Sequence, residues 1–172
     1  MIRVLVADDH TVLRDGLRYL LEAQGDIQVV GMAANGQEAL ELASQACPDV
    51  ILMDISMPVM NGIDATKRIC QICSDTKVAI LSMHHTAEYM QRAVEAGAVG
   101  YLLKDSAGAE LVTAIRAIHG GKRYLSQQLT KGLGENSIWR SGNLDRKNRS
   151  AATSRSRRSA MHGERFLTLS SL

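Results

Sequence analysis

The first 125 residues alternate between two hydrophobic patterns. Short runs rich in β-branched and aliphatic residues predict buried strands of a parallel sheet. Between them, apolar residues recur every three or four positions, which is typical of amphipathic helices, and Gly120-Gly121 ends the last of these. The predicted strands cover residues 2–7, 27–33, 50–53, 78–81 and 99–103.

This alternation predicts an α/β domain with helices on both faces of a parallel sheet, because parallel neighbours need crossover connections. Such sheets bind ligands beyond the carboxyl ends of their strands. Reactive polar residues stand directly after four of the predicted strands, so we expect them to converge at one edge. They are Asp8, Asp9, Asp54, Ser82 and Lys104.

These residue types suit phosphoryl transfer. Two carboxylates about 4 Å apart repel by roughly 4 kcal/mol at an effective dielectric near 20, so the cluster needs a cation, and Mg²⁺ accepts a few carboxylate ligands. Asp54 could form an acyl phosphate, while Lys104 and Ser82 contact the phosphoryl oxygens. Each residue alone could instead be a cap, a turn residue or a solvated side chain, but their convergence favours the functional interpretation.

Three segments carry a resemblance to a known family. Residues 4–10 (VLVADDH), 51–58 (ILMDISMP) and 100–105 (GYLLKD) resemble the signatures of bacterial two-component response regulators. The resemblance implies a flavodoxin-like (βα)5 receiver domain with five parallel strands in the order 2-1-3-4-5. It also implies that Asp54 accepts phosphate from a sensor histidine kinase, that Asp9 binds Mg²⁺ directly and Asp8 largely through water, and that Ser56 offers its backbone carbonyl to the metal.

The same resemblance implies a conformational switch at Ser82 and Tyr101. A phosphate of about −1.5 to −2 charges would attract Ser82 and Lys104 and leave space that Tyr101 enters, although Tyr101 could also be an ordinary packed tyrosine. The fourth helix, fifth strand and fifth helix, about residues 86–120, would then change and serve homodimerisation or partner contact. Ser56 and His84 match positions that tune acyl-phosphate hydrolysis, and we expect the His84-His85 pair to cap or be solvated rather than bind metal.

Residues 1–24 and 97–105 look most like the subfamily whose receivers precede a LuxR-type (NarL/FixJ-like) DNA-binding domain. Residues 126–172, by contrast, show no helix-turn-helix pattern and are rich in Ser and Arg. We therefore predict a receiver domain over residues 1–125 and a basic, disordered tail over residues 126–172. A truncated or frame-shifted gene would explain this tail; a native basic arm that binds nucleic acid or an acidic partner is the alternative.

Charge supports that division. Residues 1–125 carry 11 Lys and Arg against 15 Asp and Glu, a net charge of −4. Residues 126–172 carry the remaining 9 Lys and Arg against 3 Asp and Glu, a net charge of +6, which gives the total of +2. Any attraction to nucleic acid therefore belongs to the tail. No apolar run reaches 18 residues and no signal peptide is evident, so we expect a cytoplasmic protein without membrane association. Cys70 and Cys73 have redox or zinc spacing without a second ligand pair, which favours a structural role for the three cysteines.

Three functions remain open at this point. The first is a phospho-aspartate switch that is no enzyme and only slowly loses its own phosphate. The second is an aspartyl-nucleophile phosphatase, which the residue two positions after Asp54 disfavours, because Ser56 stands where a general-acid carboxylate would be expected. The third is a DNA-binding transcriptional regulator, which the subfamily predicts and residues 126–172 do not support.

Overall fold

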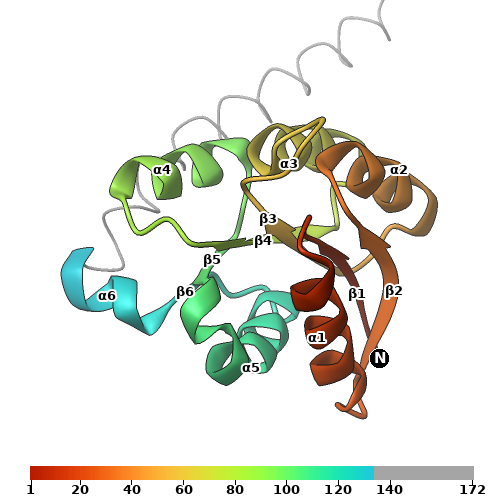
Figure 1. Cartoon of the computed structure of the whole chain (residues 1–172), viewed down its shortest axis with the longest axis horizontal. Coiled ribbons are helices and arrows are strands. Elements are labelled where there is room, and N and C mark those ends of the chain that lie inside the picture. The colour runs from red at the N-terminus through yellow and green to blue at the C-terminus, as the bar shows by residue number, and fades with distance from the viewer. Residues whose placement is uncertain (134–172) are drawn as a thin grey trace, which may run out of the picture.

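A parallel sheet of six strands lies between two layers of helices in the computed structural model, which describes residues 1–133 (Figure 1). The strand order is β2-β1-β3-β4-β5-β6. The central strands are buried on both faces, as expected where helices cover both sides of a sheet. The strands are β1 (Ile2–Ala7), β2 (Ile27–Ala33), β3 (Val50–Asp54), β4 (Lys77–Ser82), β5 (Gly100–Leu103) and β6 (Tyr124–Leu125).

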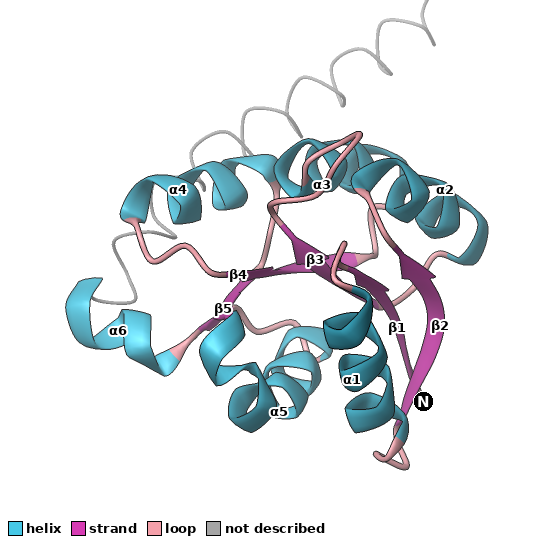
Figure 2. Cartoon of the chain, viewed as in Figure 1, coloured by secondary structure: helices cyan, strands magenta, loops and turns pink. Residues whose placement is uncertain are grey.

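Two helices cover one face of the sheet and three cover the other (Figure 2). On the first face the apolar sides of α1 and α5 pack over β1, β3 and β4, and on the second α2, α3 and α4 pack over the same strands. Each of these five helices packs its apolar side against the sheet and exposes its polar side to solvent. The helices are α1 (Thr11–Glu22), α2 (Gly36–Ala46), α3 (Gly62–Ile72), α4 (Ala87–Ala96), α5 (Ala107–His119) and α6 (Gln127–Leu133), with a 3₁₀ turn at Lys104–Ser106.

Asparagine caps and close glycine contacts position the start of α2 and α3 beside the carboxyl end of β3. The Asn35 and Asn61 side chains each accept a hydrogen bond from a backbone N–H in the first turn of the helix, at 2.9 Å. A Cβ at Gly62 would collide with the carbonyl oxygen of Asp54, and one at Gly36 would collide with that of Met60. The first turn of α3 can therefore lie directly against the backbone of Asp54.

The predicted flavodoxin-like fold is confirmed, with all five strands in the order 2-1-3-4-5. The structure adds β6, which pairs in parallel with β5 through Gly100 and Tyr101. It also adds α6 inside the segment for which we predicted disorder from Ser126 onward, and Ser126 and Leu129 are buried. A two-residue strand and a seven-residue helix are too short to produce a periodic signal. The remaining tail predictions concern residues 134–172, which lie outside the described residues.

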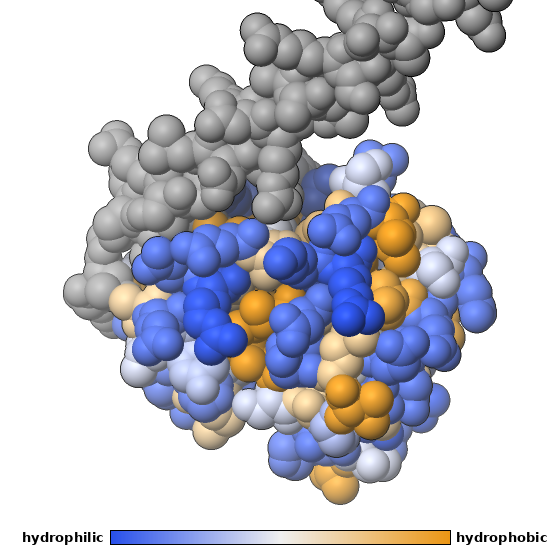
Figure 3. Space-filling model, turned by 90° about the horizontal axis from the view of Figure 1, so that it is seen from above, coloured by the Kyte–Doolittle hydropathy of each residue, from blue (hydrophilic) through white to orange (hydrophobic). Residues whose placement is uncertain are grey.

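The outer surface of the α2, α3 and α4 layer is mainly hydrophilic, with hydrophobic residues showing in small separate areas (Figure 3). Among residues 1–133, none of the helices has both the length and the apolar character needed to cross a membrane.

Candidate functional site

Side chains that follow or end three strands, β1, β3 and β5, meet at the carboxyl edge of the sheet. Asp8 follows β1, Asp54 ends β3 and Lys104 follows β5. The Lys104 Nζ lies 2.7 Å from Asp8 Oδ2 and 3.0 Å from Asp54 Oδ2. Both carboxylates are buried, with exposed fractions of 1% and 3%. One ammonium group thus holds together two carboxylates that would otherwise repel each other.

The electrostatics of Lys104 follow from this arrangement. Burial acts to lower its pKa, but the contacts with Asp8 and Asp54 outweigh burial and raise the pKa above 10.5. Lys104 therefore stays protonated at neutral pH and keeps a positive charge beside Asp54.

The acidic cluster has the composition of a divalent-cation site. Asp8, Asp9, His10 and Asp54 each offer a ligand atom, and these atoms lie within 4.8 Å of one another. Within the described residues, Asp8 Oδ2 and Asp54 Oδ2 have the ion pair with Lys104 but no hydrogen bond of good geometry, so they keep lone pairs for a cation. Three carboxylates against one lysine also leave excess negative charge, which oxygen-seeking Mg²⁺ or Ca²⁺ would neutralise.

His10 is a part of the cluster that the sequence analysis missed. Its backbone N–H donates to Asp8 Oδ1 at 2.9 Å, and its ring Nδ1 lies 3.1 Å from the same oxygen and 2.9 Å from Asp9 Oδ1. Arg14, one turn into α1, donates to the backbone carbonyl of Asp8. The position of His10 directly after two acidic residues was the available signal, but the direction of its ring depends on the folded conformation of the segment between β1 and α1.

Ser56 lies next to Asp54 on the loop after β3. Its backbone N–H donates to Asp54 Oδ1 at 3.3 Å, and its Oγ lies 3.3 Å from His84 Nε2. The two residues expected to tune hydrolysis are therefore in contact, across 28 positions of sequence. The metal-binding role of the Ser56 carbonyl stays a prediction.

The two predicted switch residues meet at the backbone of His84. The buried Ser82 Oγ accepts a hydrogen bond from the His84 N–H at 3.0 Å, and Tyr101 donates its hydroxyl to the His84 carbonyl at 2.9 Å. Burial raises the pKa of Tyr101, so the hydroxyl stays protonated and able to donate. Tyr101 is only 1% exposed and packs on the face of the sheet that α2, α3 and α4 cover. Whether it enters this position on phosphorylation stays a prediction.

The His84 ring extends this network to α4. It stacks on the ring of Tyr89, with centroids 3.9 Å apart and planes 7° from parallel. On the same helix, the guanidinium of Arg92 lies 5.9 Å from the Tyr89 ring centre. Tyr89 had no distinguishing signal in the sequence. A chain of contacts thus runs from Asp54 through Ser56 and His84 to the exposed helix α4.

The arrangement corresponds to one protein family. Residues 4–116 match the response regulator receiver domain family. The chain belongs to this family. Every predicted site residue lies within the matched residues 4–116, and the role of each stays a prediction.

Relatives of this receiver are named as transcriptional regulatory proteins and response regulators. The transcriptional regulatory protein LiaR of Bacillus subtilis (strain 168) is 47% identical over 129 residues, covering 75% of this chain and 61% of that protein. Response regulator GacA of Pseudomonas viridiflava is 41% identical over 133 residues, covering 77% and 62%. The chain thus spans less than two thirds of the length of either relative.

A solved structure shows the same fold. The crystal structure of a LuxR-family two-component response regulator from Aurantimonas sp. SI85-9A1 aligns with a TM-score of 0.74 and 38% identity. The alignment covers 79% of this chain and 97% of that chain.

Proposed function

We propose that this receiver is a phosphoryl-accepting switch in two-component signalling, with Asp54 as the acceptor and a sensor histidine kinase as the donor. The observation that carries the proposal is the buried Asp54 carboxylate, 3.0 Å from the Lys104 ammonium and within the cluster formed with Asp8 and Asp9. Membership of the receiver family supports it.

The chemistry follows from groups in contact at the site. A carboxylate oxygen of Asp54 attacks the phosphorus of the kinase phosphohistidine, the P–N bond breaks, and the histidine nitrogen leaves with the bonding electrons. Lys104 stabilises charge on the transferring oxygens, and the Ser82 hydroxyl can reorient from the His84 N–H to donate to the phosphate.

The acidic cluster fits Mg²⁺, held by Asp8, Asp9 and Asp54 with the backbone carbonyl of Ser56. When bound, Mg²⁺ would neutralise negative charge on the phosphoryl oxygens. His10 would have to release Asp8 Oδ1 and Asp9 Oδ1 as these carboxylates turn to the cation.

The output of the switch would pass through His84 and Tyr101 to α4, β5 and α5, a surface suited to homodimerisation or partner contact. Ser56 and His84 flank the acceptor and would control the approach of water, so that the phosphate is lost only slowly. The name of the relative LiaR gives its role as transcriptional regulation. In this chain, DNA binding would have to be carried by residues 126–172 or by segments beyond them.

A phosphatase would use the same nucleophile but needs a general acid beside it. The residue two positions after Asp54 is Ser56, whose hydroxyl contacts His84 and supplies no carboxylate. This favours an acceptor that keeps its phosphate over an enzyme that turns over phosphoesters.

The test is phosphotransfer from acetyl phosphate with Mg²⁺, followed by intact mass and by a phosphate-affinity gel. The wild-type chain should gain one phosphate, and Asp54→Asn should gain none. Asp75→Asn, a change at an exposed turn position, is the matched control and should behave as wild type. Equal phosphorylation of Asp54→Asn and wild type would contradict the proposal, and turnover of a phosphoester substrate would favour the phosphatase.

A further inference from the structure

Two cysteines that lie far apart in the sequence meet at the ends of two neighbouring helices. Cys47 follows the last residue of α2 and Cys73 follows the last residue of α3. Their Sγ atoms are 3.7 Å apart, across 26 positions of sequence. Cys70 shares the CxxC spacing with Cys73, but its Sγ lies 3.8 Å from the carbonyl oxygen of Gly97. The pair suggested by spacing is therefore different from the pair that the fold brings together.

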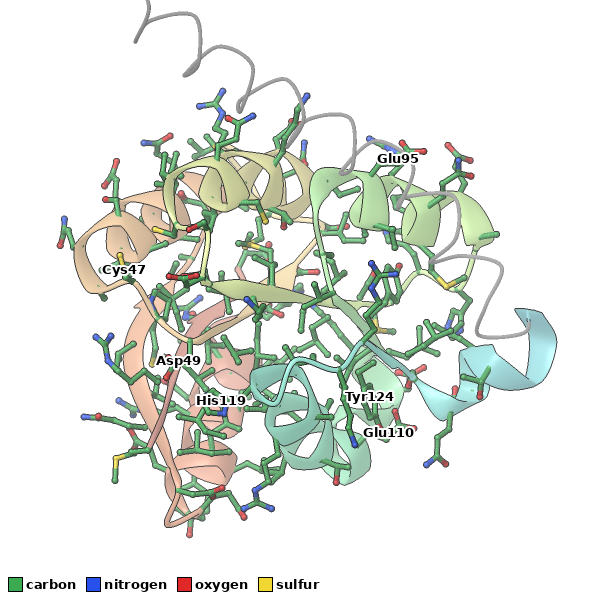
Figure 4. All side chains as sticks on the ribbon, turned by 180° about the vertical axis from the view of Figure 1, so that it is seen from behind. Cys47, Asp49, Glu95, Glu110, His119 and Tyr124 are labelled. Carbon is green, nitrogen blue, oxygen red and sulfur yellow. The ribbon has the colours of Figure 1, made fainter. Side chains whose placement is uncertain are left out.

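The two thiols differ in their access to solvent. Cys47 is exposed at the end of α2 (Figure 4), whereas Cys73 is buried, with an exposed fraction of 7%. Burial, and then the contact with Cys47, raise the pKa of the Cys73 thiol. An oxidant from solvent would thus meet Cys47 first, and Cys73 stands directly behind it.

The positions of the two sulfurs suit a direct bond. A disulfide has an S–S length near 2.05 Å, so the sulfurs must approach by about 1.7 Å, which side-chain rotation and small helix shifts can supply. The backbone of Cys47 is left-handed, with φ of 41°, at a helix end where glycine is the usual residue. The groups of three or more metal-ligating side chains found within residues 1–133 include none built on these cysteines, so the pair does not form part of a zinc site there.

We propose that Cys47 and Cys73 are a redox modification site, at which peroxide converts the two thiols to an intramolecular disulfide. The Cys47 thiol loses its proton, the thiolate attacks one peroxide oxygen, and the O–O bond breaks. Cys47 becomes a sulfenic acid, and the hydroxide that leaves takes up the Cys47 proton as water. The Cys73 sulfur then attacks the Cys47 sulfur, and the departing hydroxide takes the Cys73 proton as a second water. The two thiols lose two electrons and two protons, and the peroxide is reduced to two waters. A cellular thiol of the glutathione class reverses the bond by exchange.

The bond would close a loop from Cys47 to Cys73 that contains Asp54 and all of β3 and α3. At their other ends, α2 and α3 are already joined, because the N–H of Gly36 donates to the carbonyl of Met60 at 3.0 Å. The disulfide would add a second clamp at the end remote from Asp54. It would hold α3, whose first turn lies against the Asp54 backbone, against α2.

Peptide mapping of the full chain tests the site. After treatment with hydrogen peroxide and alkylation with iodoacetamide, free thiols should fall from three to one without disulfide-linked dimers. Trypsin should release peptides 19–67 and 69–77 joined together, with a mass two hydrogens below the sum of the reduced peptides. Dithiothreitol should separate them. The thermal midpoint should rise by several degrees on oxidation, because the loop restricts the unfolded chain.

Peptide 69–77 contains both Cys70 and Cys73, so variants must identify the partner. Cys70→Ser, the matched control, should keep the linked peptides and the thermal shift, and Cys73→Ser should lose both. If Cys73→Ser folds poorly, Cys47→Ser at the exposed position should show the same loss. Asp54→Asn should form the bond as wild type does, which separates this proposal from the proposed phosphoacceptor function.

Three outcomes would overturn the inference. They are a linked peptide that persists in Cys73→Ser, disulfide-linked dimers as the main oxidised product, and three free thiols remaining at peroxide concentrations that oxidise exposed methionines.

Discussion

Lys104 joins the two buried carboxylates of Asp8 and Asp54. Asp8 and Asp54 are 1% and 3% exposed, and their Oδ2 atoms lie 2.7 and 3.0 Å from the Lys104 Nζ. Burial of the two negative charges is unfavourable, and the ion pairs with Lys104 offset that cost. The charge that makes Asp54 a candidate nucleophile would be costly to bury without the lysine.

Removal of the lysine should therefore destabilise the fold. We expect Lys104→Ala to lower the free energy of unfolding by about 3 kcal/mol at pH 7, because breaking a buried pair leaves uncompensated charge. Urea unfolding followed by circular dichroism measures the change. Lys67→Ala, on the exposed side of α3, is the matched control and should stay within about 0.5 kcal/mol of wild type. Equal stability of the two variants would contradict the buried ion pairs.

The raised pKa of Lys104 predicts a stability change at alkaline pH. A group whose pKa is higher in the folded state stabilises the fold fully below its unfolded pKa, and that contribution disappears as pH rises through the folded pKa. For Lys104 this window begins near pH 10.5 and extends above it. Wild type should lose stability there more steeply than Lys104→Arg, whose guanidinium stays protonated.

Urea unfolding at several values between pH 9 and 12 tests this expectation. Tyr101, whose pKa is also raised by burial, titrates in the same region but is common to both proteins. The difference between the two curves therefore isolates Lys104. Parallel curves would show that the lysine pKa is not raised.

At the scale of elements, the fold extends beyond the predicted domain of residues 1–125 through α6, which a carboxylate on α5 anchors. Glu110 on α5 accepts a buried hydrogen bond from the Ser126 hydroxyl at 2.7 Å and another from the Gln127 N–H at 3.2 Å. Figure 4 shows Glu110 on the α5 side facing the segment that includes Tyr124. The carboxylate satisfies a donor at the start of α6, while Leu129 packs into the core. A polar anchor of this kind has no periodic signature in sequence.

Loss of this anchor should loosen α6 selectively. In Glu110→Ala the backbone N–H groups of residues 127–133 should exchange with solvent at least tenfold faster, while those of α1 keep their rates. Hydrogen exchange with mass spectrometry gives the measurement. Glu22→Ala, at the exposed end of α1, should leave α6 unchanged. Unaltered exchange of residues 127–133 in Glu110→Ala would show that apolar packing alone holds α6.

At the scale of the whole molecule, a series of contacts connects the acidic site at the edge of the sheet with the surface of α4. All strands end at the same edge, so Asp54 and Lys104 meet there, and β5 continues from Lys104 back to Tyr101 beneath α4. His84 touches Ser56 on one side and Tyr89 on the other. A change of charge at Asp54 can therefore act on the proposed dimer surface through Ser56, His84 and Tyr89, each in contact with the next.

This path predicts a change in assembly. With beryllofluoride and Mg²⁺ as a phosphate mimic, the full chain should shift from monomer toward dimer in sedimentation velocity, because the mimic binds Asp54 and biases α4, β5 and α5. Asp54→Asn should remain unshifted under the same conditions, and wild type with Mg²⁺ alone is the second control. A monomer under all three conditions would argue against homodimerisation as the output.

Short sequence patterns were sufficient to predict many of the strands and the positions of several site residues. The strands and the placement of Asp8, Asp54, Ser82 and Lys104 followed from short patterns, because residues at the ends of parallel strands share one edge. The strand order 2-1-3-4-5 came instead from the resemblance to response regulators. The contacts of His10 could not be predicted, since they depend on ring orientation. The inward position of Tyr101 and its bond to His84 could not either, because a buried strand residue can face either layer.

The amino-acid sequence was sufficient to predict which residues stand at the carboxyl edge and what charge they bring, because both depend on position along a strand and on side-chain chemistry. Tertiary structure alone decided which distant groups touch. Ser56 meets His84 across 28 residues, and Cys47 meets Cys73 across 26. The first contact arises because β3 and β4 pair side by side, and the second because α2 and α3 pack against each other. Both depend on the arrangement of whole elements and leave no characteristic spacing in the sequence.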